Sequence, residues 1–305
     1  MANTKPRSGP LKVRTSPEDR ALYLLTNISL VVLLIVIVYP LIYMVSSSFS
    51  SGRAVSSGRV VLLPVEPTLD GYRTVFSYKS VMTGYRNTVI YTVVGTTINV
   101  MLTLIAAFPL SRKNFQGRNF YMALFVITMF FSGGLIPSYI LVTQLKLTNT
   151  IWAIVLPGAV STYNMIITRT FFASTIPQEL IEASQIDGCD DFRFFFTILL
   201  PLSKAVIAVI GLYYGVAHWN AWFGAMLYLR DPALQPLQLV LRSILIAVSI
   251  DVSQIQDPEL LERMVYMADL MKYALIIVAT VPIVAMYPFV QRYFIKGVMI
   301  GSIKG

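Results

Sequence analysis

The sequence predicts an all-α membrane protein with six transmembrane helices. Of its 305 residues, 56% are hydrophobic and only 13% are charged. The mean hydropathy of +0.68 is far above that of a soluble globular protein. Six apolar stretches are each long enough to cross about 30 Å of hydrocarbon, and no Asp, Glu, Lys or Arg lies near the middle of any of them.

The predicted spans follow one another along the chain after a polar beginning. They cover residues 21–49, 87–110, 119–145, 148–168, 205–229 and 273–290. The first span is too long for the core of a signal peptide and lacks a small-residue cleavage pattern, so it should remain in the mature protein. Residues 1–20 carry Pro6, Pro10 and Pro17 among polar and basic side chains, and we expect them to form a disordered tail.

Helix-breaking residues interrupt two of the predicted spans. Gly133–Gly134 and Pro137 break the third span, and Pro157–Gly158 interrupts the fourth. Such residues are tolerated at membrane depth only where neighbouring groups or a water-lined cavity satisfy the freed backbone. They could be hinges or packing sites. The second span carries small and polar residues that could serve close helix packing or line a pore, namely Gly95, Thr96, Thr97 and Asn99.

The segment 177–201 lies between two spans and predicts a short helix, a glycine turn and a second helix. Pro177 suits the first position of a helix, and residues 178–187 alternate acidic and apolar side chains at helical spacing. Gly188 supplies the left-handed residue that ends such a helix. Either Asp190 or Asp191 can cap the second helix. The apolar face of that helix is predicted to hold Phe192, Phe195, Phe196 and Leu199, before Pro201 stops or kinks it.

This segment resembles the EAA loop of ABC importer permeases. The matching residues are Glu182, Ala183, Asp187, Gly188, Ile198, Leu200 and Pro201. Ser184 and Cys189 depart from the usual pattern, but both are small. The resemblance implies a type I ABC importer permease fold, in which the first helix is a cytoplasmic coupling helix that docks in a cleft of the ATPase. An ordinary amphipathic interfacial helix is the alternative. The residues expected to couple to the ATPase are Glu179, Glu182, Ala183, Ser184, Asp187 and Gly188.

The end of the chain, 291–305, resembles the tail of carbohydrate-type permeases, the group of the smaller maltose-importer permease. There the tail reaches the interface between two ATPases, and a basic tail at the lipid surface is the alternative. The implied tail residues are Lys296, Gly297, Gly301 and Lys304. The stretches 84–88, 131–137 and 218–223 resemble the branch that handles larger oligosaccharides and uronic-acid fragments.

The residue types exclude several other functions. With a single cysteine and a single histidine, the chain has no disulfide framework and no cluster of Cys or His ligands for a metal. His218 could hydrogen-bond within the bundle or relay protons. No phosphate-binding loop of the form G-x-x-x-x-G-K-[ST] is present, so ATP and Mg²⁺ are expected on partner ATPase subunits, and the chain is not expected to be an enzyme. The net charge of +9 fits basic residues at membrane borders, in contact with anionic lipid, better than nucleic-acid binding.

The expected arrangement follows from six spans and the coupling loop. Both termini are predicted to be cytoplasmic in a bacterial inner or plasma membrane, with a tail at 1–20, a permease domain at 21–293 that includes the EAA loop 177–201, and a tail at 294–305. The loops 50–86 and 230–272 are then extracellular, and they are expected to receive the binding protein and the partner permease.

A sugar path needs apolar faces for stacking and polar groups for the sugar hydroxyls. The path candidates are Tyr163, Asn164, Trp219, Asn220 and Trp222, although interfacial aromatic belts explain many such residues. The resemblance implies a permease subunit of an ATP-driven, binding-protein-dependent importer of carbohydrate, expected to be an oligosaccharide. Its partners would be a second permease, two ATPase subunits and an extracellular or lipid-anchored solute-binding protein. An ion-coupled secondary sugar transporter is the main alternative, disfavoured by the uncharged spans. A membrane-embedded enzyme acting on a lipid-linked sugar is the other.

Overall fold

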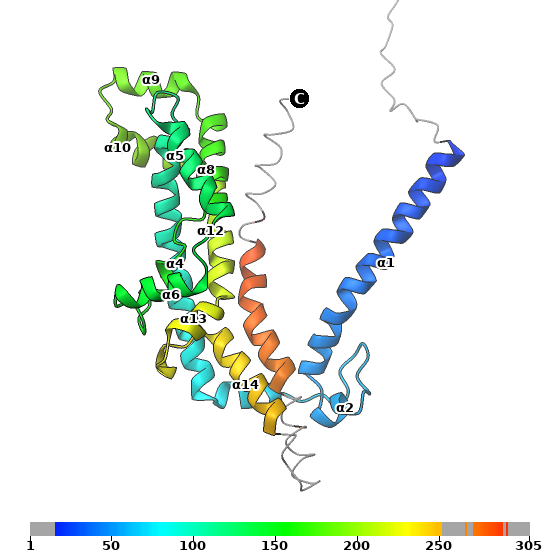
Figure 1. The fold of residues 1–305 in the computed structure, drawn as a ribbon. Helices are drawn as coiled ribbons and strands as arrows, with labels where there is room; N and C mark the ends of the chain where they lie inside the picture. Colours follow the sequence, from blue (N-terminus) through cyan, green and yellow to red (C-terminus); the bar gives the residue numbers. More distant parts are fainter. Residues whose placement is uncertain (1–15, 252–265, 267–270, 289–290, 292–305) are drawn as a thin grey trace, which may run out of the picture.

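A long helix, α4 (Lys79–Ser111), forms the axis of the fold in this computed structural model, which describes residues 16–251, 266, 271–288 and 291 (Figure 1). Helices α8 (Thr162–Thr175) and α12 (Lys204–Trp219) pack along α4 and are its main neighbours. Helix α9 (Gln178–Ile186) lies at one end of this bundle, and α2 (Gly52–Ser56) lies at the other. These two ends are called the α9 end and the α2 end below.

The described residues form helices, turns and loops, with no strand among them. The remaining α-helices are α1 (Pro17–Ser48), α3 (Asp70–Ser77), α5 (Arg118–Phe130), α6 (Leu135–Gln144), α7 (Trp152–Val155), α10 (Asp191–Phe194), α11 (Leu200–Leu202), α13 (Phe223–Tyr228), α14 (Leu237–Asp251) and an unlabelled helix Met271–Pro288. A π-helical turn, Phe195–Leu199, joins α10 to α11, and a 3₁₀ turn, Pro232–Leu234, precedes α14.

Helix α1 stands apart from the bundle over most of its length (Figure 1). It begins at Pro17 because Ser16 forms a capping box, in which the Ser16 hydroxyl accepts the Asp19 N–H at 3.1 Å and the Asp19 carboxylate accepts the Ser16 N–H at 3.0 Å. The prediction of disorder up to residue 20 is therefore wrong for residues 17–20. None of the most apolar stretch of α1 is buried within the chain. A helix that is apolar on all sides and exposed in this way fits contact with lipid or with another membrane subunit.

The number of membrane crossings is only partly decided by helix length. Within the described residues, three helices are long and apolar enough to cross a membrane, or up to five if each bent pair counts as one span. The three are α1, α4 and Met271–Pro288. The bent pairs are α5 with α6 and α10–α11 with α12. The count of six spans remains a prediction.

Glycine and proline break the two spans in which the sequence placed them. Gly134, with φ at 84°, separates α5 from α6, and the two helices meet at 114°. Gly158, with φ at 73°, lies in the irregular segment between α7 and α8, directly after Pro157. The predicted span 148–168 is therefore two short helices and not one. The predicted span 205–229 is also interrupted, because α12 ends at Trp219 and α13 begins at Phe223.

Small and polar residues let α4 and α12 approach each other closely. The Asn99 amide nitrogen lies 2.9 Å from His218 Nε2, which confirms that His218 hydrogen-bonds within the bundle. Thr103 and Tyr214 share a hydrogen bond of 2.7 Å between their hydroxyl groups. A Cβ atom at Gly95 would lie 2.5 Å from His218 Nε2, so Gly95 is a packing residue. Thr97 is exposed on another side of α4, and the predicted small and polar stripe is thus not a single face.

Substitution of Gly95 by Ala should destabilise the bundle. The added methyl group would displace the hydrogen-bonded His218 ring, and such overpacking costs about 1–3 kcal/mol. Gly211→Ala on α12 is the matched control, because a Cβ atom there meets nothing within 4 Å. We expect a lower unfolding temperature in detergent for the first variant and an unchanged or higher one for the second. Equal unfolding temperatures would contradict the close contact.

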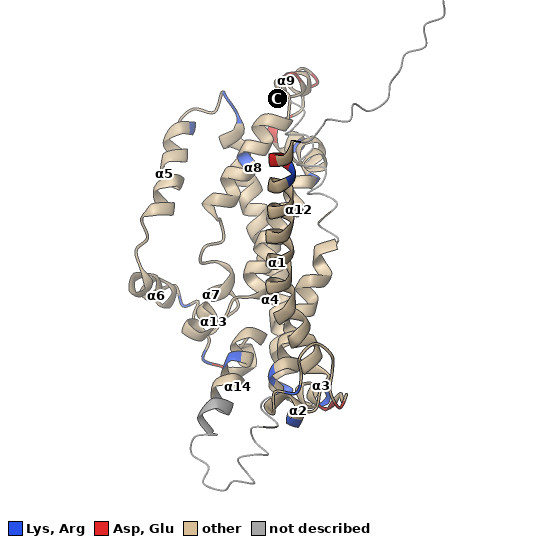
Figure 2. Cartoon of the chain, turned by 90° about the vertical axis from the view of Figure 1, so that its right-hand side faces the viewer, with Lys and Arg blue, Asp and Glu red and all other residues tan. Residues whose placement is uncertain are grey.

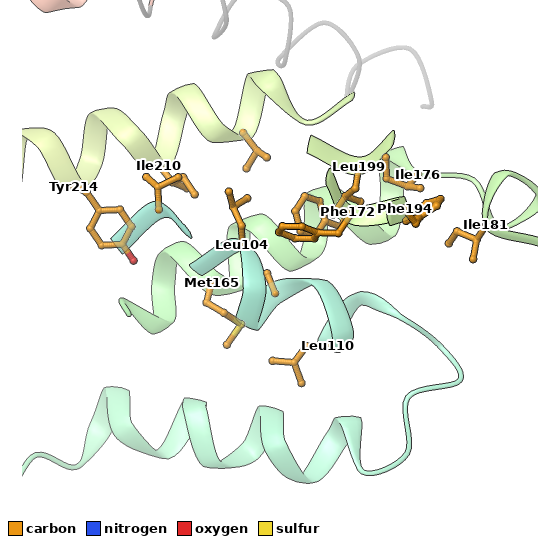
Figure 3. Close-up of a cluster of buried hydrophobic side chains, with 14 residues drawn as sticks. Leu104, Leu110, Met165, Phe172, Ile176, Ile181, Phe194, Leu199, Ile210 and Tyr214 are labelled. Atoms are coloured by element: carbon orange, nitrogen blue, oxygen red, sulfur yellow. The ribbon is translucent and has the colours of Figure 1, made fainter. Parts of the chain in front are cut away.

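The largest buried cluster among the described residues lies toward the α9 end of the bundle. It contains Leu104 of α4, Met165 and Phe172 of α8, and Ile210 of α12. Figure 3 shows these side chains together with Ile181 of α9 and Phe194 of α10, which belong to the same cluster. The core of the bundle therefore continues without interruption into the segment that follows α8, and this segment is held in a defined position.

Charged side chains of the described residues gather toward the two ends of the bundle (Figure 2). The middle of the long helices is formed by uncharged residues (Figure 2). Because an ionised side chain is costly in hydrocarbon, this distribution matches a membrane-embedded middle with two polar borders.

Candidate coupling surface and transport path

Helix α9 begins and ends where the local sequence requires. Pro177 takes the N-cap position, one residue before the first helical position in which the sequence analysis placed it. Gly188, with φ at 71°, follows the C-cap residue Asp187. Two backbone bonds close the turn: the Gly188 N–H donates to the Gln185 carbonyl at 3.0 Å, and the Cys189 N–H donates to the Ser184 carbonyl at 2.9 Å. A left-handed residue is easiest for glycine, so Gly188 sets the direction in which the chain leaves α9.

One face of α9 is held by the bundle, and the other is open. Ile181 and Ser184 are buried, and the Ser184 hydroxyl donates to the Ile181 carbonyl at 2.7 Å. The small residue that departs from the EAA pattern therefore packs against the core. Ile186 at the end of the helix is 86% exposed. The other exposed members of the predicted coupling set are Glu179, Glu182, Ala183, Asp187 and Gly188. We call this exposed face, with Ile186, the coupling surface.

The second helix of this segment differs from its predicted pattern. Asp190 caps it, since the Asp190 carboxylate accepts the Arg193 N–H at 2.7 Å. Phe195 and Leu199 are buried, whereas Phe192 and Phe196 are exposed, although Phe192, Phe195 and Phe196 all line one hollow beside Phe108 of α4. The π-helical turn Phe195–Leu199 changes the angular spacing of the side chains that follow Phe194. Pro201 follows this turn, has no N–H to donate to the preceding turn, and lies within the short helix α11, which ends at Leu202.

Arg112 connects this segment to the end of α4. Its guanidinium Nη2 donates to the Asp191 carboxylate at 2.7 Å, and its Cζ atom lies 4.8 Å from the centre of the Phe108 ring and 5.0 Å from that of Phe194. The Arg112 side chain is only 11% exposed, whereas that of Asp191 is 71% exposed. A guanidinium that both stacks on rings and pairs with a carboxylate holds α10 against α4 in one orientation. Nearby, Arg169 Nε donates to the Leu110 carbonyl at 3.0 Å and joins α8 to the same end.

The sequence analysis did not single out Arg112 from the basic residues at the membrane borders. Its position two residues after the end of a predicted span could have drawn attention to it, but many basic residues of membrane proteins lie at such a border. Its partner Asp191 is 79 residues away in the sequence, and no local pattern links the two.

The structure separates the predicted path residues into different places. Asn220 and Trp222 both line a cavity of about 480 Å³ between the end of α12, α14 and the helix Met271–Pro288. Trp219 is buried, and its indole N–H donates to the Ala279 carbonyl at 2.9 Å, which favours a packing role. Tyr163 and Asn164 lie on α8, where Tyr163 is 58% exposed and Asn164 is buried. Among these candidates only the pair Asn220 and Trp222 shares a described cavity.

The segment after α1 folds into a small substructure at the α2 end. Glu66 accepts hydrogen bonds from the Ser51 hydroxyl at 2.5 Å and from Arg59 Nη2 at 2.9 Å. The Ser51 hydrogen bond first, and the Arg59 guanidinium second, lower the pKa of the Glu66 carboxyl group below its usual value. The ionised form therefore stabilises this loop at neutral pH, and that contribution is lost as the pH falls through the lowered pKa.

The predicted tail residues Lys296, Gly297, Gly301 and Lys304 lie outside the described residues.

Comparison with known proteins matches this chain to one protein family and to relatives along most of its length. The family described as the binding-protein-dependent transport system inner membrane component matches residues 81–300. Protein LplC of Bacillus subtilis (strain 168) is 39% identical over 268 residues, which cover 88% of this chain and 90% of that protein. The polygalacturonan/rhamnogalacturonan transport system permease protein YtcP of the same organism is 40% identical over 278 residues, covering 89% and 94% of the two chains.

A solved structure agrees with this fold. A chain in the crystal structure of a bacterial ABC transporter involved in the import of the acidic polysaccharide alginate is 31% identical, with a TM-score of 0.83. The match covers 92% of this chain and 99% of that chain. The names of the second relative and of the solved structure both describe transport. The chain therefore belongs to the family of binding-protein-dependent transport system inner membrane components, with the all-helical type I permease fold of ABC importers.

Proposed function

We propose that the chain is a transmembrane permease subunit of an ATP-driven, binding-protein-dependent ABC importer, and that it carries an oligosaccharide into the cell. The observation that carries this proposal is the coupling surface: an exposed acidic helix face held on the bundle core, with Glu182 at its centre. The names of relatives support the sugar assignment, since they include permease proteins for arabinooligosaccharides and for maltodextrin.

In this proposal, α9 docks in a cleft of a cytoplasmic ATPase, and Glu182 pairs with a basic residue of that subunit. ATP and Mg²⁺ bind to the two ATPase subunits, and a second permease completes the membrane part. When ATP closes the ATPase pair, the movement of α9 passes to the membrane helices along two connections. One is the buried cluster that contains Ile181, and the other is the pair of Arg112 and Asp191. An extracellular binding protein delivers the sugar.

The same proposal orients the protein in a bacterial inner or plasma membrane. The α9 end faces the cytoplasm, and the α2 end, with α14, faces outward. Both termini are then cytoplasmic and the chain crosses the membrane six times. The charged side chains toward the two ends of the described part support a membrane-embedded middle (Figure 2).

The experiment is ATP-driven uptake into membrane vesicles that hold the tagged chain with its co-expressed partner subunits and binding protein. We expect uptake of a radiolabelled oligosaccharide, either maltotetraose or tetragalacturonate, that requires ATP and continues when an uncoupler removes ion gradients. Co-purification of an ATPase with the tagged chain is the second readout. Uptake that stops with the uncoupler while ATP persists, without a co-purifying ATPase, would replace this proposal with an ion-coupled sugar transporter.

A further inference from the structure

We propose that the cavity beside Trp222 is a subsite for a carboxylate-bearing sugar residue, and that Arg242 binds the carboxylate. This inference rests on the proposed function, because it assigns the charge of the transported sugar. The cavity measures about 480 Å³ and lies between the end of α12, α14 and the helix Met271–Pro288. Arg242 is the cationic residue of its lining, and the sequence analysis did not single it out.

Arg242 is placed by an aromatic ring. Its guanidinium Cζ lies 4.5 Å from the centre of the Trp222 ring, and Nη1 contacts the Met226 sulfur at 2.8 Å. The Trp222 ring is itself held edge-on against Phe223, with ring centres 5.6 Å apart. Stacking uses the face of a guanidinium and leaves N–H donors at its edge, in the geometry that a carboxylate accepts in two parallel hydrogen bonds.

No protein carboxylate among the described residues forms an ion pair with this guanidinium. The Arg242 side chain is exposed on the cavity, and α14 is firmly anchored on its other side. There, the Leu237 N–H donates to the Thr88 hydroxyl at 2.8 Å. Gly84 lies so close to α14 that a Cβ atom added to it would be 3.1 Å from Leu237 Cα. A cation on a helix held in this way, unpaired with any carboxylate of the described residues, is suited to an anion that comes from outside the chain.

The remaining lining suits a sugar better than a simple inorganic anion. Asn220 uses its amide nitrogen to donate to the Val216 carbonyl at 2.9 Å, and Thr280 donates its hydroxyl to the Ile276 carbonyl at 2.7 Å. Both therefore keep an oxygen that can accept a sugar hydroxyl. Gln238 adds an amide, and Leu241, Leu245 and Ile276 supply apolar surface. Apolar walls with a few polar groups and one cation are what a uronate residue requires.

The test measures equilibrium binding to the purified importer complex without the binding protein, with Trp fluorescence as the readout. The ligands are tetragalacturonate and its full methyl ester, which keeps the sugar skeleton and removes the charge. We expect Arg242→Gln to weaken tetragalacturonate binding by about 10- to 100-fold, since hydrogen bonds to charged groups are worth about 1.5–3 kcal/mol. Binding of the methyl ester should be unchanged, and Arg242→Lys should lie between. Arg230→Gln is the matched control, because that exposed residue is not part of the cavity lining.

The proposal is overturned if wild type shows no preference for the acid over the ester, including the case in which neither binds. It is also overturned if Arg242→Gln weakens both ligands equally, as expected if Arg242 only packs or meets a lipid phosphate. ATP-driven uptake measured in the same vesicles separates this result from the proposed function. An importer that carries maltotetraose with ATP, yet shows no acid preference, leaves the proposed function intact and removes only this subsite.

Discussion

Replacement of Glu182 by Lys is expected to abolish sugar uptake and the stimulation of ATP hydrolysis by the loaded binding protein. Glu182 is exposed on α9, and its described contact within the chain is a hydrogen bond of 3.3 Å from the Gln178 amide. The helix does not depend on this contact, so the variant should fold. At an interface with a basic partner, like charges cost several kcal/mol, which corresponds to far more than a tenfold loss of docking.

Glu18→Lys provides the matched control for this experiment. Glu18 is also exposed and begins α1 at the same end of the molecule, but it is not part of α9 (Figure 1). Its reversal replaces a favourable charge at a helix N-terminus with an unfavourable one, each worth about 0.3–1 kcal/mol. We expect it to retain uptake and ATP hydrolysis, measured in the same vesicles. If Glu182→Lys performs like Glu18→Lys, the coupling surface does not bind the ATPase through this carboxylate.

Replacement of Arg112 by Leu is expected to separate ATP hydrolysis from sugar uptake. The substitution removes the pairing with Asp191 and the stacking on Phe108 and Phe194, while the coupling surface on α9 stays unchanged. The ATPase should therefore still co-purify with the chain. Because the movement of α10 would no longer reach α4 in full, we expect the amount of sugar taken up per ATP hydrolysed to fall by about 5- to 150-fold, the usual range of coupling between two sites.

Two further variants separate coupling from simple loss of stability. Arg112→Lys keeps the charge but lacks the planar guanidinium, and it should fall between wild type and Arg112→Leu. Arg193→Leu in the same helix is the control, since that side chain is exposed and is not in an ion pair among the described residues. The amounts of each variant in the membrane and its co-purifying ATPase report on folding. A normally assembled Arg112→Leu complex with an unchanged ratio of uptake to ATP hydrolysis would exclude Arg112 from coupling.

Local chemistry explains which features could be predicted from the sequence. The length of the apolar run predicted α1 and α4, because membrane thickness sets that length. The glycine turn at Gly188 and the cap at Asp190 depend on a few neighbouring residues, and both are confirmed. The breaks near Gly134 and Gly158 were predicted for the same reason.

Features that depend on distant partners could not be predicted. Trp219 is of a residue type that can stack on a sugar, but its indole N–H donates to a carbonyl 60 residues away, in another helix. The angle of 114° between α5 and α6 depends on packing that a pair of glycines permits but does not specify. Phe194 is buried while Phe196 is exposed, and a π-helical turn begins between them at Phe195, which a regular helical spacing does not anticipate. Arg242 was missed because its significance comes from the ring of Trp222, on a neighbouring segment of the fold.

The most direct test of the central claim is cross-linking between the coupling surface and the ATPase in native membranes. Cys189 is the single cysteine of the chain, so Cys189→Ala leaves a cysteine-free background. Ile186→Cys then places one thiol on α9, where the native side chain is 86% exposed. Leu63→Cys, at a position that is 77% exposed in the segment after α2, serves as the control. A short thiol–amine cross-linker should join the chain to the ATPase from position 186 and not from position 63. Cross-linking from position 63, or from neither position while the ATPase co-purifies, would contradict the account.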